Sequence, residues 1–271
     1  MTSSPSDVSI KLALSDDDYV WSHSRIKQFD NCKYGFYMKY ILGLKEEDRF
    51  FSQFGSFVHK ILEKYFKGEI EKSKLYEYYI CNFNKEVNTP APSPKIFASY
   101  FNGGAEYFKN FDETGFENIV DVEKKLFFKI GNKKFVGIID LLAETETGKY
   151  ILVDHKSKML KPRSGRKKPT VSDNELDEYL NQLYLYAIPL TQKGIEVDSL
   201  MFNCFRNSSK IKETFYCEKM KEVEEQILAK ISEIENNTKW TPNLENEFFC
   251  RNLCGFTGQC EYFQMCYGKG T

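Results

Sequence analysis

Residues 135–158 read FVGIIDLLAETETGKYILVDHKSK, two apolar runs that flank a polar, glycine-bearing turn. The first run ends at Asp140 and the second ends at Asp154, His155 and Lys156, which predicts a β-hairpin. Side chains alternate between the faces of a strand, so Asp154 and Lys156 share one face. A buried acid at a strand end costs free energy unless a cation holds it. We therefore expect a divalent metal beside Lys156, an arrangement that suits phosphodiester hydrolysis.

The bulk composition excludes several classes of protein. The chain has 271 residues, 41% of them hydrophobic, which is enough for one large domain or a domain with an appended lobe. Its net charge is −1, so any contact with nucleic acid must come from local basic clusters. No apolar run has the length of a membrane span, and the start, MTSSPSDVSIKLALSDDDY, lacks the features of a secretory signal. We expect no membrane partner and a cytoplasmic location in a prokaryotic cell or a phage-infected host.

The hydrophobic pattern predicts an α/β fold. Residues 1–20 are polar and acidic, and we expect them to be poorly ordered. Apolar periodicity predicts helices near 24–43, 54–66, 71–85, 95–112, 175–193 and 218–237. It predicts strands near 119–130, 134–143, 149–157, 197–206 and 211–217. This order favours a mixed central sheet flanked by helices, with a helical N-terminal part and a loop-like, Cys-rich C-terminal region.

Four short motifs occur in order along the chain. They are GSFVH at 55–59, GIID at 137–140, DHK at 154–156 and QLYLY at 182–186. Together they resemble the GxxxH, GxxD, (D/E)xK and QxxxY motifs of the RecB-type branch of the PD-(D/E)XK nuclease superfamily. Each motif alone is weak, but four in order form a specific signal. The resemblance implies a restriction-endonuclease-like fold for residues 21–240.

The resemblance also implies a role for each motif residue. Asp140 and Asp154 would donate oxygen ligands to Mg²⁺ or Mn²⁺. His59 would add a nitrogen ligand, and the backbone carbonyl of His155 would complete the set. Lys156 would orient or help deprotonate the attacking water and offset charge in the transition state.

Gln182 and Tyr186 lie one helical turn apart, so both are expected to face the scissile phosphate from one helix. Each of these residues also has an ordinary alternative. Tyr186 is compatible with a core position, His59 with a satisfied half-buried histidine, and either acid alone with a solvated strand end. The set taken together favours the active-site interpretation.

The C-terminal sequence CRNLCGFTGQCEYFQMC is dense in cysteine. Cys254, Cys260 and Cys266 recur every six residues and make four thiolates together with Cys32. Four thiolates suit either a [4Fe–4S] cluster or Zn²⁺, and the spacing does not separate the two. Cys250 is the spare: it either substitutes for Cys254 or is a buried thiol.

The resemblance favours iron–sulfur for this group. An early cysteine paired with a late trio marks the iron–sulfur subgroup, which includes AddB-type nuclease domains and CRISPR-associated exonucleases. Residues 241–271 would then complete a metal site with Cys32, and the free energy of metal binding would contribute to folding.

A basic loop follows the DHK motif. Its cations are Lys158, Lys161, Arg163, Arg166, Lys167 and Lys168. A flexible basic loop beside the metal would attract a DNA backbone without reading bases. The alternative is a solvated charge run.

These observations predict a metal-dependent DNA nuclease, specifically an exonuclease acting on DNA ends or single strands. The chain has no P-loop GxxxxGK[ST], so helicase activity would come from a partner in recombination, repair or CRISPR adaptation. Two alternatives remain at this stage. One is a non-catalytic DNA-binding protein on a nuclease fold, and the other is a structural protein held by zinc.

Overall fold

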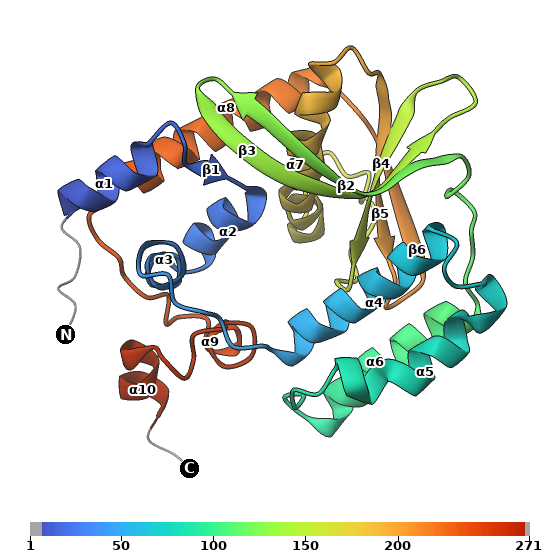
Figure 1. Cartoon of the computed structure of the whole chain (residues 1–271), viewed down its shortest axis with the longest axis horizontal. Helices are drawn as coiled ribbons and strands as arrows, with labels where there is room; N and C mark the ends of the chain where they lie inside the picture. Colours follow the sequence, from blue (N-terminus) through green and yellow to red (C-terminus); the bar gives the residue numbers. More distant parts are fainter. Residues whose placement is uncertain (1–6, 269–271) are drawn as a thin grey trace. The chain divides into compact units, whose positions relative to one another are not determined.

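The computed structural model describes residues 7–268, which form two compact units (Figure 1). Within the described residues, the first unit comprises residues 7–52, 127–136 and 224–268. The second comprises residues 53–126 and 137–223. The four motifs of the sequence analysis therefore all fall within the second unit, whereas Cys32 and the Cys-rich tail fall within the first.

The described residues contain both helices and strands. The strands are β1 (Val20–Trp21), β2 (Ile119–Ile130), β3 (Lys133–Glu144), β4 (Tyr150–Lys156), β5 (Val197–Cys204) and β6 (Ser209–Thr214). The α-helices are α1 (Asp7–Ser15), α2 (His23–Asn31), α3 (Lys33–Phe36), α4 (Phe50–Phe66), α5 (Leu75–Glu86), α6 (Pro94–Lys109), α7 (Val171–Thr191), α8 (Cys217–Glu235), α9 (Glu247–Asn252) and α10 (Glu261–Tyr267). A π-helical turn η1 (Tyr37–Ile41) and a 3₁₀ turn η2 (Lys72–Lys74) complete them.

The strands of residues 7–268 form one mixed sheet in the order β1-β3-β4-β5-β6, with β2 paired to β3. β3 and β4 are antiparallel, as the predicted hairpin requires, with Leu141 opposite Val153. β4 and β5 are parallel, and β5 and β6 are antiparallel. The predicted fold, a mixed sheet flanked by helices with a helical N-terminal part, is confirmed.

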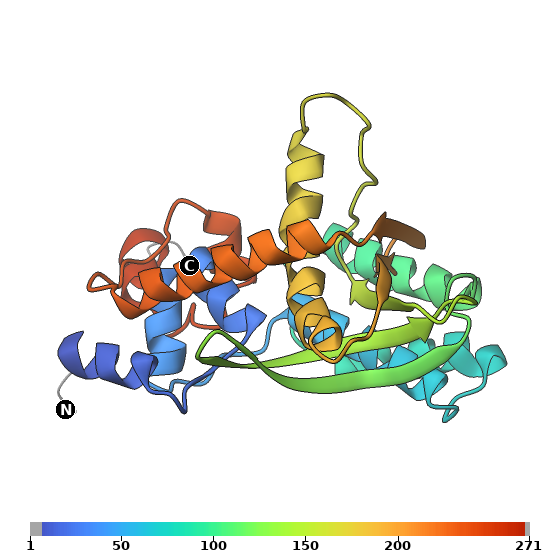
Figure 2. The same ribbon diagram turned by 90° about the horizontal axis from the view of Figure 1, so that it is seen from above.

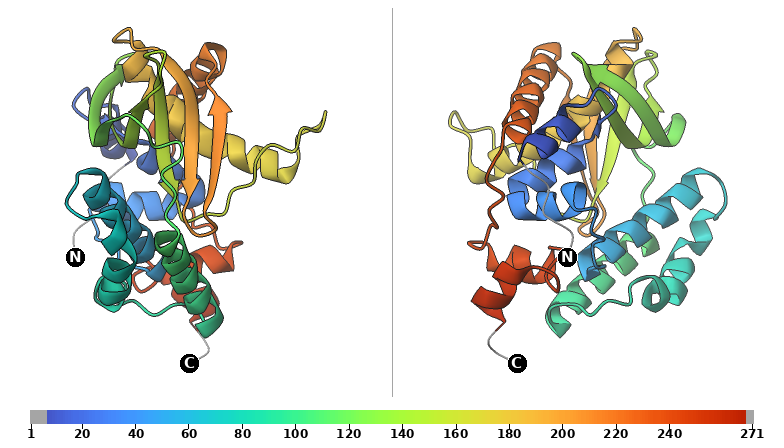
Figure 3. Two further views of the ribbon diagram at one scale, coloured as in Figure 1. Left: turned by 90° about the vertical axis from the view of Figure 1, so that its right-hand side faces the viewer. Right: turned by 60° about the vertical axis from the view of Figure 1, so that its left-hand side comes forward.

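Helices cover both faces of the sheet in the second unit (Figure 3). His155 of β4 has its ring stacked on Phe66 of α4, with ring centroids 6.3 Å apart. On the opposite face, Phe202 of β5 contacts Tyr179 of α7. α5 and α6 pack with α4 through buried rings such as Phe57 against Tyr79. β3 and β4, which carry the GIID and DHK motifs, therefore lie inside the sheet, where neighbouring strands and helices hold their side chains in place.

In the first unit an aromatic cluster joins segments that are distant in sequence. Trp240 stacks on Phe36 with ring centroids 5.8 Å apart and contacts Phe29 edge-on. An ion pair between Lys33 and Glu233 adds a further link. Burial of these rings places Trp240, which precedes the Cys-rich tail, beside α2 and α3, the two helices that flank Cys32.

Local capping fixes two helix boundaries. α2 begins after Ser22, whose hydroxyl accepts from the backbone N–H of Arg25, close to the predicted start near residue 24. α7 begins at Val171, four residues before the predicted start, because Thr170 and Asp173 form a capping box. A reciprocal box satisfies two backbone donors at once, which stabilises this earlier first turn.

The structure differs from the predicted segmentation at both ends of the chain. The segment 1–20, expected to be poorly ordered, contains α1 and the start of β1, whereas residues 1–6 lie outside the described part. The tail, expected to be loop-like, contains the short helices α9 and α10. Of the helices in residues 7–268, none combines the length and the apolarity that crossing a membrane requires.

Candidate functional site

The two predicted catalytic carboxylates lie at neighbouring strand positions. Asp140 of β3 precedes Leu141, the Cα partner of Val153, so Asp140 and Asp154 are adjacent across the hairpin. The Oδ2 atom of Asp140 accepts a hydrogen bond of 2.6 Å from the backbone N–H of His155. Antiparallel pairing therefore places both acids at one point of the sheet.

His59 reaches this point from α4. Its Nε2 lies 2.9 Å from the carbonyl oxygen of His155 and its Nδ1 lies 3.6 Å from Oδ2 of Asp140. A carbonyl oxygen only accepts, so Nε2 carries the ring proton and Nδ1 keeps a lone pair facing the carboxylate. Burial lowers the pKa of His59, so the ring is neutral at pH 7. A neutral acceptor nitrogen pointing at a carboxylate is a typical arrangement around a metal ion.

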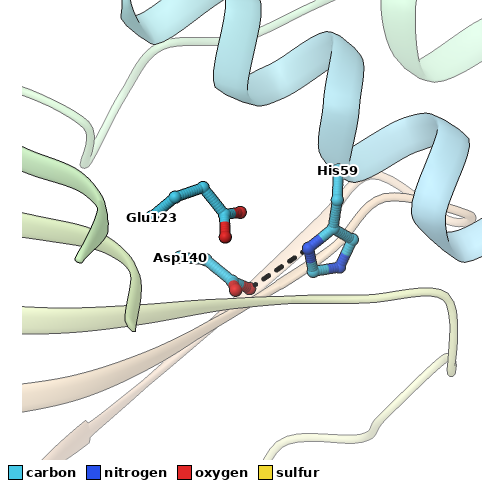
Figure 4. Close-up of side chains that lie close together, drawn as sticks. All are labelled: His59, Glu123 and Asp140. Atoms are coloured by element: carbon cyan, nitrogen blue, oxygen red, sulfur yellow. Dashed lines mark ion pairs between the residues drawn. The ribbon is translucent and has the colours of Figure 1, made fainter. Parts of the chain in front are cut away.

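Glu123 of β2 is a further site residue, and the sequence analysis missed it. Ligand atoms of His59, Glu123 and Asp140 all lie within 4.8 Å of one another (Figure 4). Glu123 adopts a left-handed backbone conformation, with φ of 54°, inside a strand. This conformation costs a non-glycine residue free energy, and such residues cluster at functional sites. No short motif surrounds Glu123, so the sequence carried no local signal for it.

The carboxylates are crowded into a desolvated space. Burial and the charge of Asp154 raise the pKa of Asp140 well above its usual range. Burial and the charge of Asp140 raise the pKa of Glu123 to about 7. Both pKa values are raised because buried carboxylates that lie close together resist ionisation. A divalent cation bound by these oxygens and by Nδ1 of His59 would remove that cost. The donor set therefore fits Mg²⁺ or Mn²⁺.

Lys156 is held by two polar partners. Its Nζ lies 2.8 Å from Oδ2 of Asp154 and donates a 2.9 Å hydrogen bond to Oε1 of Gln182. Burial disfavours the ammonium, but the charge of Asp154 outweighs this and raises the pKa of Lys156. The charge of Asp154 therefore favours the ammonium form of Lys156, which suits the predicted role of offsetting negative charge.

Gln182 and Tyr186 lie on one face of α7, as expected. The amide of Gln182 donates to the hydroxyl of Tyr186 at 3.3 Å. The Tyr186 side chain is only 8% exposed, and its ring packs on Gly137, where a Cβ atom would lie 2.6 Å from Cε1. The glycine of the GIID motif is thus required by close contact with the tyrosine of the QLYLY motif.

The side chain of His155 serves the core. It is 3% exposed, and its Nδ1 accepts from Nδ2 of Asn203 at 2.9 Å. Its backbone, in contrast, belongs to the site, because the N–H binds Asp140 and the carbonyl binds His59. A carbonyl oxygen has two lone pairs, so this one retains capacity for the predicted metal contact.

The basic loop between β4 and α7 extends past the N-terminus of α7 (Figure 2). Two of its six cations have acidic partners: Lys158 pairs with Glu175, and Arg163 pairs with Asp177 and Glu213. The other four are exposed: Lys161, Arg166, Lys167 and Lys168. Asp173 also accepts from both the backbone and the hydroxyl of Ser164, which ties the loop to the first turn of α7.

The cysteines of the first unit gather in a different combination from the predicted one. Cys32, Cys250 and Cys260 are buried, Cys254 is partly buried and Cys266 is exposed on α10. Burial, with added repulsion from Cys32 and the other sulfurs, raises the pKa of Cys250 and of Cys260 and raises that of Cys254 to about 11. The spare cysteine of the sequence analysis is thus close to Cys32.

Two backbone N–H groups point at the sulfur of Cys32, from Gly35 at 3.3 Å and Asn243 at 3.5 Å. Hydrogen bonds from N–H groups to sulfur are typical of thiolate-bound metal sites. The sulfurs do not form a ligand group as tight as that of His59, since that group is the one within 4.8 Å among the described residues. Donor chemistry therefore fits a thiolate-bound metal, while the sulfurs stay further apart than the ligands of the acidic site.

Comparisons with known proteins agree with the fold. Residues 20–266 match the family model of the PD-(D/E)XK nuclease superfamily. The chain is 26% identical over 193 residues to the uncharacterized protein RT0391 of Rickettsia typhi, and the match covers 61% of this chain and 20% of that protein. The chain therefore spans about a fifth of the length of that curated relative.

A crystal structure from Eubacterium rectale, described as a "Putative exonuclease", matches with a TM-score of 0.51 and 14% identity. The match covers 98% of this chain and 93% of that one. At this identity the likeness supports the fold alone.

Proposed function

Because the chain belongs to the PD-(D/E)XK nuclease superfamily, we propose that it is a Mg²⁺- or Mn²⁺-dependent deoxyribonuclease. The observation that carries the proposal is the convergence of His59, Glu123 and Asp140 within 4.8 Å, next to the Lys156–Asp154 ion pair. Ligands for a hard cation and a phosphate-binding cation then lie side by side, as phosphodiester hydrolysis requires.

The metal ligands in this proposal are Asp140, Asp154, Glu123 and Nδ1 of His59, with the His155 carbonyl as a further oxygen. When bound, the ion supplies Lewis-acid polarisation of the phosphate and a lower pKa for the attacking water. Asp154 has a second duty, because its charge keeps Lys156 protonated.

The remaining steps belong to side chains. The ammonium of Lys156 offsets negative charge that accumulates on the scissile phosphate. Gln182 orients this ammonium through a 2.9 Å hydrogen bond and is itself held by Tyr186. Lys161, Arg166, Lys167 and Lys168 contact the DNA backbone without base specificity.

The preference for ends or single strands rests on the resemblance to RecB-type exonucleases and on the description of the Eubacterium rectale protein. Partners in recombination, repair or CRISPR adaptation follow from the same resemblance.

We further propose that Cys32, Cys250, Cys254 and Cys260 ligate a [4Fe–4S] cluster, with Zn²⁺ as the alternative occupant. Cys250 replaces Cys266 in this set because Cys250 is buried beside Cys32 and Cys260, whereas Cys266 is exposed. Four thiolates suit either metal, and an anaerobic preparation that absorbs near ~400 nm would identify iron–sulfur.

The experiment that tests the function is digestion of end-labelled DNA with Mn²⁺, Mg²⁺ or EDTA. We expect cleavage with either metal and none with EDTA. The cleavage rate of Asp154→Ala should fall by about 10³-fold or more, because the metal loses a ligand and Lys156 loses its ion-pair partner. Asp198→Asn, a partly exposed acid near the start of β5 that pairs with Lys212, serves as the control and retains activity. Equal digestion of linear and circular single strands would exclude an exonuclease, and a fully active Asp154→Ala protein would end the enzyme proposal.

A further inference from the structure

Arg206 lies at the end of the sheet where the DHK motif of β4 ends, but it belongs to none of the motifs. It follows β5, two residues after Cys204, which is the Cα partner of Lys156 in the parallel β4–β5 pair. The backbone N–H of Phe205 donates to the carbonyl of Lys156 at 3.1 Å. Arg206 therefore occupies the same end of the sheet as Lys156, one strand away.

Packing fixes the Arg206 side chain. Its guanidinium carbon lies 4.3 Å from the ring centroid of Tyr100 on α6, in cation–π contact. A Cβ atom on Gly103 of α6 would lie 2.9 Å from Cγ of Arg206, so the helix backbone lies close against the stem. The Nε–H is buried and has no acceptor among the described residues. Leaving a buried donor unpaired costs free energy, so this placement is not explained by stability alone.

Arg206 also carries a charge that the rest of the site does not neutralise. Among the described acidic residues, none forms an ion pair with it, in contrast to Lys158 and Arg163 of the basic loop. Its contact with Tyr100 is electrostatic but contributes no negative charge. A partly exposed, positioned guanidinium without a carboxylate is suited to a phosphate.

Cations and rings alternate between Lys156 and Arg206. Nζ of Lys156 lies 5.5 Å from the ring centroid of Tyr179. Lys158 interacts electrostatically with both Tyr179 and Tyr100, and Tyr100 contacts Arg206. This row consists of Lys156, Tyr179, Lys158, Tyr100 and Arg206, all within the second unit. Because cations already occupy positions over the two rings, the row favours contact with a backbone over stacking of bases.

We propose that Arg206 binds a phosphate next to the scissile one and so holds the DNA strand across the end of β4 and β5. The inference rests on the proposed nuclease function and deepens it by naming the surface that the substrate strand follows. The recognised chemistry is the phosphodiester backbone, so binding through this row is independent of base sequence.

The test measures binding of fluorescein-labelled single-stranded oligonucleotides by anisotropy in EDTA, over a range of salt concentrations. We expect Arg206→Ala to weaken binding about 5- to 20-fold at low salt and to reduce the salt slope by about 1, equally for oligo-dT and mixed sequences. In cleavage assays KM should rise while kcat changes little, because the contact is made before and during the reaction. Lys109→Ala removes one exposed cation from α6 and is the matched control.

Arg206→Gln retains most of the stem against Gly103, so it decides the question if the alanine variant unfolds in a thermal melt. Loss of affinity and of salt slope in the folded glutamine variant supports the inference. Affinity and slope equal to those of Lys109→Ala overturn it. A wild-type protein that cleaves DNA while Arg206→Gln binds normally refutes this inference alone, whereas a wild-type protein that neither binds nor cleaves DNA refutes the proposed function.

Discussion

The acidic site of the second unit and the cysteine group of the first unit are both clusters of metal-binding side chains, but they are built differently. The proposed ligands of the acidic site come from the long helix α4 and from strands β2, β3 and β4, and ligand atoms of those on α4, β2 and β3 lie within 4.8 Å of one another. The cysteines come from helix caps, the short helix α9 and the turn after it. Regular elements position side chains before the ion arrives, whereas caps and turns depend more on the metal for their final geometry.

This contrast predicts that the largest effect of a single substitution on stability will be at the cysteines. Cys250→Ser should remove the bound metal and lower the unfolding free energy by about 3 kcal/mol or more, because metal binding there contributes to folding. Cys266→Ser is the matched control, since its exposed thiol should leave both metal content and melting temperature unchanged. Metal analysis and thermal melting decide between them. Metal loss in Cys266→Ser with retention in Cys250→Ser would restore the originally predicted ligand set.

Glu123→Gln should have the next largest effect, and it tests the acidic site. Removing one charged oxygen should raise the Mn²⁺ concentration for half-maximal cleavage by roughly 10- to 100-fold, with little change in stability. The measurement is a Mn²⁺ titration of the initial cleavage rate, with Glu77→Gln, an exposed acid on α5, as the control. An unchanged titration would remove Glu123 from the ligands.

Gly137→Ala tests whether the packing of Tyr186 on β3 positions the acidic site. The added methyl group would lie 2.6 Å from the Tyr186 ring, so we expect a loss of about 1–3 kcal/mol in unfolding free energy and reduced cleavage. Gly131→Ala lies in the turn between β2 and β3, at φ of 57°, and separates backbone strain from ring contact. Denaturant unfolding followed by fluorescence provides the free energies. A variant as stable and active as the parent would mean that Tyr186 moves without cost.

Asp140→Asn should have the smallest effect on stability, and of opposite sign. The folded-state pKa of Asp140 is raised, so in EDTA the protein loses stability as pH rises from about 4 through that pKa. The asparagine variant lacks this penalty and should be more stable by about 1 kcal/mol near pH 8, with little difference near pH 5. Melting temperatures in EDTA across this range test the sign. Excess Mn²⁺ should reverse the order, because only the parent binds it well.

The sequence predicted the strands and helices that form the acidic site because their apolar periodicity is strong. The hairpin from Asp140 to Lys156 follows directly from two apolar runs and a turn. Boundaries were less accurate where capping intervened, as at Thr170 of α7. The short helices α9 and α10 carry too few apolar positions to show a period, so their helical form depends on the surrounding packing.

The candidate site residues show the same difference between local signals and contacts formed by folding. Asp154, Lys156 and Gln182 were found because each lies in a motif whose spacing is local. Glu123 and Arg206 belong to no motif. Only the folding of β2 brings Glu123 next to His59 and Asp140, and only the pairing of β5 with β4 places Arg206 near the end of the DHK strand. The raised pKa of Lys156 likewise depends on its ion pair with Asp154 and on burial, and burial is set by the tertiary structure.

By itself, the sequence determined which chemical groups this protein has and which of them recur at strand and helix spacing. The tertiary structure decided their charge states and partners: a neutral His59, a protonated Lys156, and Cys250 in place of Cys266 beside Cys32. The physical reason is that periodicity depends on near neighbours along the chain, whereas burial and electrostatic interaction depend on distances between segments that only folding brings together.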